Sequence, residues 1–409
     1  MNKKKSGWKT RHLLLSLLSL KNPPLMKTNL SIFAQIIRLI PRDIIHKNVD
    51  EHDSDFNSKG INSWTHLVSM LYCQFGNCQS IRDISFGLRS ATGNLSHLGV
   101  CRAPSKSSIS YINAHRGWTF FRDVYFSLFK EFKVKVNRLR LNRKLFILDS
   151  TLIPLCLSLF DWAYYRKMKG AIKIHTVLDY DSCLPVFIRM TDGKTSDIEI
   201  AEKLAFPKGS ILTIDRGYLD FNFLRELDSS GVFFVTRAKS NIDCDIVKLL
   251  ALPNESENIV SDYQIVLIGQ QTKGKYKKRL RLVKVTDPET GEIIPLLTNN
   301  FTWTSKTISE LYRYRWEIET FFRLVKQNLK IKSFIGTSEN AVLIQIWSAL
   351  ITILLLSVLK TKALYKWHMS NMVGFIRLNL FVKIDLFEWL NHPFLQDKAP
   401  PGQIQLDLF

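Results

Sequence analysis

The chain has 409 residues, with 57 Lys and Arg against 36 Asp and Glu and a formal net charge of +21. A chain of this length buries a large core and is expected to form two or three domains. The charge favours a polyanionic partner, which nucleic acid or an acidic membrane surface would satisfy equally. The six cysteines contain no Cys-x-x-Cys pair, which argues against a zinc cluster and favours reduced thiols.

Residues 1–26 form a basic tail whose apolar run from His12 to Leu20 is similar to a signal peptide. The run is short, no small-residue cleavage site follows it, and Lys21 to Pro24 interrupt it. Met26 would serve equally well as the first residue, which would place this tail upstream of the true start.

Residues 27–140 have the apolar spacing of helices. Within them, Pro104 to Ser108 leads into a helical segment that contains Tyr111 and Arg116. A Ser-capped helix with polar and basic residues near its start suits recognition of a DNA major groove. The same pattern is typical of an ordinary helical hairpin, so the sequence leaves both interpretations open.

From Lys144 the period changes to that of β-strands. One short apolar run ends at Asp149, and a second ends at Asp215, which Arg216, Gly217 and Tyr218 follow. Segments 170–179 and 184–191 are predicted to complete an antiparallel meander with the first strand. Helical segments at 197–205 and 221–229 and a strand at 231–236 are predicted to follow. The first and fourth strands are expected to be neighbours.

Four polar side chains share one sector of about 60° if residues 312–326 form a single helix: Tyr312, Arg315, Glu319 and Lys326. A charged stripe on an exposed helix would only solvate it and add roughly 0.2–0.5 kcal/mol for each ion pair. A carboxylate flanked by an arginine, a lysine and a phenol instead suits a metal-binding acid beside groups that hold phosphates.

The three acids Asp149, Asp215 and Glu319 are therefore predicted to converge as catalytic, metal-binding residues. Ligands of α/β sheets gather at the carboxyl ends of strands, which is where both aspartates are expected. Oxygen ligands without His or Cys favour Mg²⁺ or Mn²⁺. Two such ions about 3.5–4 Å apart would activate a water or a 3′-hydroxyl for phosphoryl transfer. His175 is expected to be a core histidine, and Asp197 to have a turn or cap role.

Asp149, the turn from Asp215 to Tyr218 and the series Tyr312, Arg315, Glu319 and Lys326 resemble the signature of DDE transposases of bacterial insertion sequences. More narrowly, they resemble insertion sequence family four, and the resemblance extends from about Leu145 to Leu359. It implies an α/β fold with a ribonuclease-H-like catalytic core, a mostly β insertion domain within that core and an all-α N-terminal DNA-binding domain. It also implies that Tyr312, Arg315 and Lys326 hold phosphates at the element end.

These expectations divide the chain into a helical DNA-binding domain at 27–140, a catalytic core at 141–237 and 301–365, an insertion domain at 238–300 and a C-terminal region at 366–409. The insertion contains a basic segment that we predict to contact DNA phosphates: Lys275, Lys277, Lys278, Arg279 and Arg281. Its alternation of basic and apolar residues fits a strand with a positive face, and equally an edge strand protected by charge.

The segment from Ala341 to Leu359 is apolar and long enough to span a bilayer. Polar residues interrupt it, including Gln345, Ser348 and Thr352, and no second such segment accompanies it. The sequence therefore predicts a helix buried in the core behind the catalytic helix.

The resemblance implies a cut-and-paste transposase that acts on double-stranded DNA, at terminal inverted repeats and at a target. It also implies a homodimer on DNA, in the bacterial cytoplasm at the nucleoid and with no membrane partner. Two alternatives stay open: a catalytically inactive, transposon-derived DNA-binding protein, and a nuclease of the same fold without strand transfer.

Overall fold

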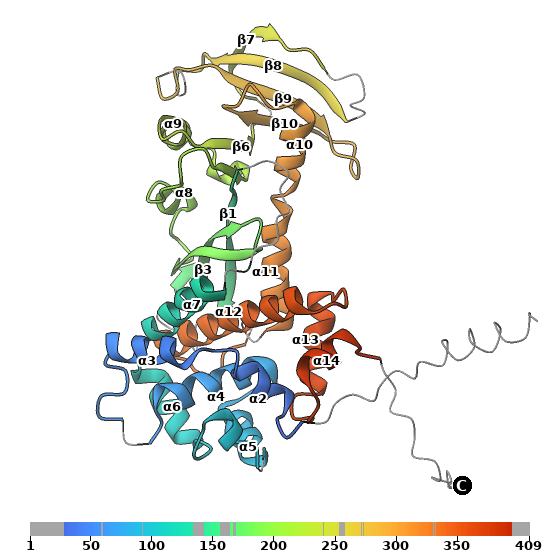
Figure 1. The fold of residues 1–409 in the computed structure, drawn as a ribbon. Helices are drawn as coiled ribbons and strands as arrows, with labels where there is room; N and C mark the ends of the chain where they lie inside the picture. The colour runs from blue at the N-terminus through green and yellow to red at the C-terminus, as the bar shows by residue number, and fades with distance from the viewer. Residues whose placement is uncertain are drawn as a thin grey trace, which may run out of the picture.

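A helical region and a long mixed β-sheet make up the part of the chain that the structure describes (Figure 1). This computed structural model describes residues 28–58, 60–91, 93–132, 134, 143–155, 164–166, 169–239, 241–252, 258–270, 272, 274–329, 331 and 333–394. The predicted basic tail at residues 1–26 lies outside these residues.

The helical region combines helices from both ends of the described chain. Its N-terminal elements are α2 (Ile32–Ile37), α3 (Arg42–Glu51), α4 (Ser63–Phe75), α5 (Ile81–Ser90), the short 3₁₀ helix η1 (Ser96–Leu98), α6 (Lys106–His115) and α7 (Thr119–Phe132). Its C-terminal elements are α12 (Glu339–Lys362), α13 (Met369–Leu378) and α14 (Leu386–Asn391). Side-chain caps begin several of them, since Asn62, Ser80 and Ser105 each accept a hydrogen bond from a backbone N–H of the first turn.

Helix α12 is the apolar segment that the sequence singled out. Its most apolar 18-residue window is fully buried inside the protein, and the helix packs against α4, α6 and α7. Ser348 and Thr352 satisfy their hydroxyls on backbone carbonyls one turn earlier, those of Ile344 and Ser348. The prediction of a buried core helix is confirmed, and its neighbours are mainly the N-terminal helices.

The central strands follow the predicted order. Strand β1 (Leu145–Leu155) pairs antiparallel with β3 (Lys169–Asp179), which pairs antiparallel with β4 (Leu184–Asp192) and with the short β2 (Tyr164–Arg166). On its other side β1 pairs in parallel with β5 (Ile211–Ile214), and β5 with β6 (Phe233–Arg237). The predicted meander and the contact between the first and fourth strands are confirmed. Helices α8 (Asp197–Ala201) and α9 (Phe221–Ser229) and the 3₁₀ turn η3 (Arg216–Tyr218) connect these strands.

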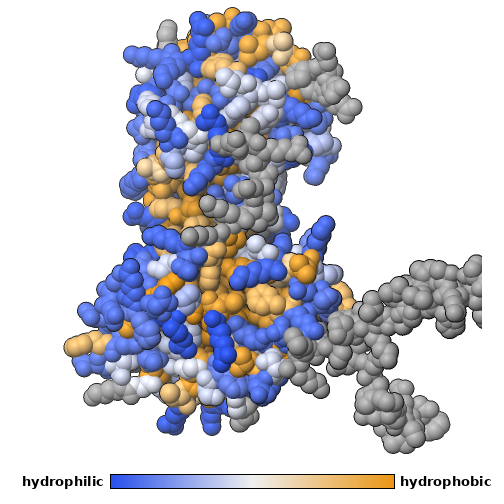
Figure 2. All heavy atoms as spheres, viewed as in Figure 1, coloured by the Kyte–Doolittle hydropathy of each residue, from blue (hydrophilic) through white to orange (hydrophobic). Residues whose placement is uncertain are grey.

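The strands of the insertion extend the same sheet. They are β7 (Cys244–Leu249), β8 (Ile259–Leu267), β9 (Leu280–Thr286) and β10 (Ile293–Thr298), and β10 pairs antiparallel with β6. Strand β9 lies between β10 and β8, so the interpretation of the basic segment as part of an edge strand is wrong. In Figure 2, hydrophobic side chains gather where the sheet meets the helical region and again at the tip that carries β7.

Alternation along β1 decides which side chains reach which face of the sheet. Leu145 and Ile147 belong to the core that includes α10 (Ser305–Arg313), α11 (Trp316–Asn328) and the helical region. Phe146 and Leu148 belong to a second core, which includes residues of α9. Continuing this alternation, Asp149 faces α11 and the next residue faces the opposite side.

Candidate active site

Asp149 and Asp215 lie on neighbouring strands at the point where these strands separate. The parallel pairing of β1 with β5 stops at Leu148 and Ile214, the residues directly before the two aspartates. Strand β1 does not end at Asp149, as the sequence predicted, but continues to Leu155 because β3 remains paired with it. The two carboxylates are nevertheless brought to one edge of the parallel pair.

The residues 312–326 do not form the single predicted helix. Helix α10 ends at Arg313 and α11 begins at Trp316, with Tyr314 and Arg315 as their caps. Both cap residues keep right-handed helical dihedral angles, so the interruption is a tightened turn in which the Arg315 N–H donates to the Tyr312 carbonyl at 3.0 Å. Tyr312 therefore belongs to the first helix, and Glu319 and Lys326 belong to the second.

The Arg315 side chain joins the acids. Its Nη1 donates a hydrogen bond to Glu319 Oε1 at 2.7 Å and lies 3.8 Å from Asp149 Oδ2. The Tyr312 hydroxyl donates to Asp215 Oδ1 at 3.4 Å. The predicted acids and two of their predicted basic or phenolic neighbours thus meet in one place. Because only 9% of the Arg315 side chain is exposed, its charge acts on these carboxylates with little screening.

The electrostatics of Asp149 reflect this crowding. Burial, together with the nearby charges of Asp215 and Glu319, raises the pKa of Asp149 to about 6. The backbone N–H of Ser150, which donates to Asp149 Oδ1 at 2.8 Å, and the Arg315 charge oppose that rise. An acid whose carboxylate form is disfavoured by burial and by neighbouring acids is typical of a site that a cation completes.

An open groove of about 380 Å³ runs from the acids along α11. Asp149 and Glu319 line one part of it, and Lys326 lies in the same groove, where its Nζ donates to the Thr151 hydroxyl at 2.6 Å. The other polar residues that line the groove were not predicted from the sequence: Ser150, Thr151, Arg323 and Gln327. Helical spacing from Glu319 would have found the last two, since Arg323 is four residues and Gln327 eight residues further on.

The donor chemistry of the three acids fits a hard divalent cation, because every donor is a carboxylate oxygen. Their present arrangement does not close around an ion: no group of three His, Cys, Asp or Glu residues in the described ranges is placed to hold one. The reason is visible in the contacts, since Arg315 lies between Asp149 and Glu319 and Tyr312 holds Asp215. A cation would have to displace the guanidinium from Glu319.

The predicted phosphate contacts of the insertion divide into two groups. Arg281 is buried in an ion pair: its guanidinium donates to both Asp262 oxygens, at 2.9 and 2.6 Å, and to the Trp303 carbonyl at 2.6 Å. Its prediction as a phosphate contact is wrong, because the side chain is enclosed in the sheet with its donors engaged. The other four residues are exposed and precede β9: Lys275, Lys277, Lys278 and Arg279. Lys278 already pairs with Asp228 at 2.6 Å.

Known proteins match this chain over its sheet and its active-site helix. Residues 140–355, more than half of the chain, match the family described as the transposase DDE domain. Residues 28–101 match a second family, described as a domain of unknown function (DUF4372).

Three curated relatives carry transposase names. "Putative transposase y4zB" of Sinorhizobium fredii is 31% identical over 260 residues, which cover 63% of this chain and 72% of that protein. "Probable transposase for insertion sequence element IS5377" of Geobacillus stearothermophilus is 31% identical over 58% of this chain and 63% of that protein. "Putative transposase for insertion sequence element IS4SA" of Synechocystis is 23% identical over 69% of this chain and 80% of that protein.

Among solved structures, the piggyBac transposase synaptic complex with hairpin DNA aligns with 92% of this chain and 87% of its own, at 12% identity and a TM-score of 0.43. Enzymes of the matched family generally use divalent metal ions. The chain belongs to the DDE transposase family and is a DNA transposase, an enzyme that cleaves and transfers DNA strands.

Proposed function

We propose that Asp149, Asp215 and Glu319 are the catalytic, metal-binding acids of this transposase, within a ribonuclease-H-like core. The strand order β4-β3-β1-β5-β6, with β1, β5 and β6 parallel, supports that core. The observation that carries the proposal is the position of Arg315 Nη1, 2.7 Å from Glu319 and 3.8 Å from Asp149. One cation already stabilises acids that come from two distant segments of the chain.

The acids are proposed to bind Mg²⁺ or Mn²⁺, as a pair of ions. Bound ions would supply Lewis-acid activation of the attacking water or 3′-hydroxyl and stabilise the leaving oxygen. Asp149 and Asp215, fixed on adjacent strands, set the spacing of the ligands. Glu319 is delivered by α11 after its release from Arg315, and the freed guanidinium then has a planar fork available for phosphate oxygens.

The groove beside the acids is proposed to hold the backbone of the element end. Lys326 and Arg323 place positive charge along it, on the same stretch of α11 that carries Glu319. Tyr312 offers a hydroxyl at the other side of the acids. A strand held in this groove would present its phosphodiester bond to the acids, so that hydrolysis and the later attack by the 3′-hydroxyl use one site.

The helical N-terminal region is proposed to bind the terminal repeats. No acidic residue occurs between Asp83 and Asp123. A groove of about 900 Å³ lies between α5 and α6 and is lined by four basic residues, Arg82, Arg89, Arg102 and Lys106. Such a surface attracts a duplex, and α6 begins there with exposed Ser107 and Tyr111 on its outer side. The exposed lysines and arginine before β9 are proposed as additional phosphate contacts.

The proposed reaction is cut-and-paste transposition in the bacterial cytoplasm, at the chromosome, by a homodimer that brings two ends together. The Tyr312, Arg315, Glu319 and Lys326 series supports membership of insertion sequence family four, and one relative is named for an element IS4SA. The domain boundaries proposed are 27–140, 141–237 with 301–365, 238–300 and 366–409. The described C-terminal helices pack with the N-terminal ones. One contact between the two regions is the hydrogen bond from the Ile32 N–H to the Val382 carbonyl, at 3.0 Å.

The test is cleavage of a DNA fragment that carries the flanking ends of the gene, with Mg²⁺ or Mn²⁺. We expect 3′-hydroxyl ends at the element boundary with the unaltered protein. Asp149→Asn and Glu319→Gln should abolish cleavage and retain DNA binding. Glu317→Gln is the matched control, because Glu317 lies on the same helix and accepts a hydrogen bond from the Cys183 thiol at 3.7 Å.

Each other outcome points to a different protein. Cuts that survive Asp149→Asn and Glu319→Gln would remove the site assignment. DNA binding without cleavage in the unaltered protein would identify an inactive, transposon-derived binding protein. Cleavage at the ends without strand joining into a second DNA would identify a nuclease of the same fold.

A further inference from the structure

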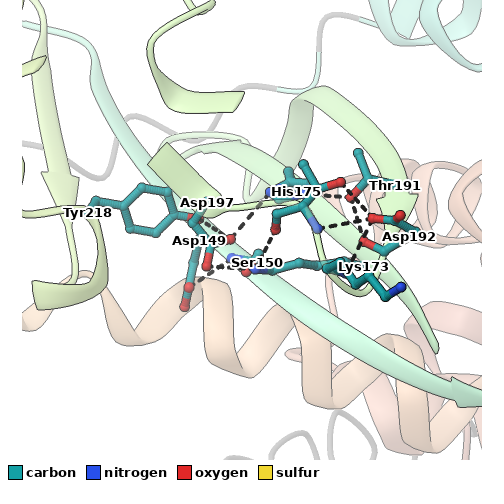
Figure 3. A network of polar contacts seen from close by, with 10 residues as sticks. Asp149, Ser150, Lys173, His175, Thr191, Asp192, Asp197 and Tyr218 are labelled. Carbon is teal, nitrogen blue, oxygen red and sulfur yellow. Dashed lines mark hydrogen bonds and ion pairs between the residues drawn. The ribbon is translucent and has the colours of Figure 1, made fainter. Parts of the chain in front are cut away.

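The Asp197 carboxylate is surrounded by donors from three other segments of the chain (Figure 3). The Lys173 Nζ donates to Oδ2 at 2.8 Å, and His175 Nδ1 lies 3.3 Å from Oδ1. The Tyr218 hydroxyl donates to Oδ1 at 3.4 Å, and the Ser150 hydroxyl also hydrogen-bonds to this carboxylate. Asp197 is the first residue of α8.

The sheet register explains why these donors meet. Ser150 on β1 is paired with His175 on β3, and Lys173 is two residues from His175, so all three share one face. This is the face opposite the one that Asp149 occupies, because Ser150 is the next residue on the strand. Tyr218 reaches the same face from η3, three residues after Asp215. Asp197 therefore contacts the immediate neighbour of one catalytic aspartate and the turn that follows the other.

The network is partly buried and charged, with Asp197 as its most exposed ion-pair partner, at 28% of its side chain. The His175 side chain is fully buried and that of Lys173 is 14% exposed. Burial of Asp197 opposes its ionisation, but hydrogen bonds from His175, Lys173 and Ser150 together hold the pKa of its carboxyl well below the usual range. The carboxylate is thus an acceptor for all of its neighbours at neutral pH.

The far side of the His175 ring is fixed as well. Its Nε2 lies 2.9 Å from the Thr191 hydroxyl, which itself donates to the Asp192 carbonyl at 3.0 Å. The ring is held between β4 and Asp197 and has no room to rotate without breaking a contact.

We propose that Asp197 is a positioning residue for strand cleavage. Its contacts connect β1 to the turn after β5 on the face opposite the acids, and so set the spacing of Asp149 and Asp215. The inference rests on the proposed function, since it concerns the geometry of those two acids. Asp197 touches neither DNA nor an ion in this assignment. Residues that orient metal ligands from outside typically contribute about 10–100-fold to metal affinity or rate.

The test compares Asp197→Asn with Glu199→Gln in the full chain. Both substitutions replace a carboxylate with an amide on α8, but Glu199 is exposed and pairs only with Lys203 in the described contacts, at 3.0 Å. We expect Asp197→Asn to lower the cleavage rate constant about 10-fold or more and to raise the Mn²⁺ concentration for half-maximal cleavage. Affinity for the DNA ends should be unchanged, and Glu199→Gln should match the unaltered protein in every measurement.

Ser150→Ala provides an independent arm that leaves the charged part of the network in place. It should lower the rate without lowering Tm, and in the double variant with Asp197→Asn the two effects should be less than additive. Additive effects of the two substitutions would overturn the inference. It would also be overturned if the rate loss in Asp197→Asn matched the fraction of unfolded protein and the Mn²⁺ dependence stayed unchanged. If Asp197→Asn does not fold, Ser150→Ala decides alone: a rate equal to that of the unaltered protein overturns it.

The same assay separates this inference from the proposed function. If Asp149→Asn abolishes cleavage while Asp197→Asn and Ser150→Ala leave rate and Mn²⁺ dependence unchanged, the acids stand and the positioning role is wrong. If Asp149→Asn still cleaves DNA, the proposed catalytic acids are wrong, and the positioning role that rests on them is wrong as well.

Discussion

The Arg315 guanidinium donates a 2.7 Å hydrogen bond to the Glu319 carboxylate, four residues further along the chain. The same nitrogen is the nearest described cation to Asp149. This arginine therefore places positive charge beside both acids. Under the proposed function, Arg315 and a divalent ion would compete for Glu319, because each would use the same carboxylate oxygens.

Replacing this arginine tests the competition. Arg315→Gln should lower the stability of the protein without added metal, by about 1–3 kcal/mol, because two partly buried acids lose a charged hydrogen-bond partner. It should also increase the rise in Tm that Mn²⁺ produces, because the ion no longer displaces a guanidinium. The measurement is thermal unfolding with and without Mn²⁺. Arg323→Gln, at an exposed position on the same helix, is the control; equal Mn²⁺ shifts in both variants would argue against competition.

The Arg281 and Asp262 pair predicts a stability effect and no effect on DNA affinity. Arg281→Met should destabilise the protein by about 3–5 kcal/mol, because it leaves Asp262, which is fully buried, without its counter-charge. Urea unfolding measures the loss. The double variant Arg281→Met with Asp262→Leu should recover part of it, since no charge then remains buried. A drop in DNA affinity at unchanged stability would restore Arg281 as a phosphate contact.

The exposed residues before β9 predict the opposite pattern. Lys277→Gln combined with Arg279→Gln should leave Tm unchanged and weaken DNA binding. The slope of log affinity against log salt concentration should fall by about 0.9 for each phosphate that the protein no longer neutralises. Binding titrations at several salt concentrations measure this slope. Lys203→Gln, an exposed lysine on a different part of the surface, should leave the slope at its original value.

The buried His66 predicts acid sensitivity of the helical region. Burial lowers the pKa of His66 to about 3, and its Nε2 donates to Asn113 Oδ1 at 2.7 Å. Below about pH 6.5 the unfolded chain binds a proton that the folded protein excludes until about pH 3. The free energy of unfolding should therefore decrease as the pH is lowered through this window. His66 should contribute up to about 1.4 kcal/mol of this decrease per pH unit. The slope should shrink in His66→Gln and persist in His46→Gln, which alters an exposed histidine.

Local patterns predicted much of the fold because the spacing of apolar residues follows burial. The continuous apolar run from Leu145 to Leu148, buried on both faces of the sheet, and the helical spacing of residues 221–229 both correspond to observed elements. The end of β1 was misplaced because Asp149 interrupts the apolar run, while pairing with β3 holds the backbone extended beyond it. That pairing is a long-range contact, and no window of sequence contains it.

The sequence predicted that the three acids meet, but it missed other polar residues of the groove and the contacts within the site. Acidic residues after apolar runs indicated Asp149 and Asp215, which directly follow the last paired residues of β1 and β5. The interruption at Arg315 was missed, since helical periodicity does not register a single tightened turn. Arg281 was misassigned because an alternating basic pattern does not reveal Asp262 on the neighbouring strand. The Asp197 network was missed for the same reason, as its donors come from three segments brought together by the sheet.

The antiparallel pairing of β6 with β10 places the two ends of the insertion side by side. The chain leaves the core at Arg237 and returns on the adjacent strand, where the Ala238 N–H donates to the Pro295 carbonyl at 2.8 Å. The two points of departure and return are thus hydrogen-bonded neighbours. A tight turn joining them would convert β6 and β10 into an ordinary hairpin. The residues between these points nevertheless add Ile265 and Leu282 to the core that contains Leu148 and Ile214, so a deletion here would remove side chains packed behind both aspartates.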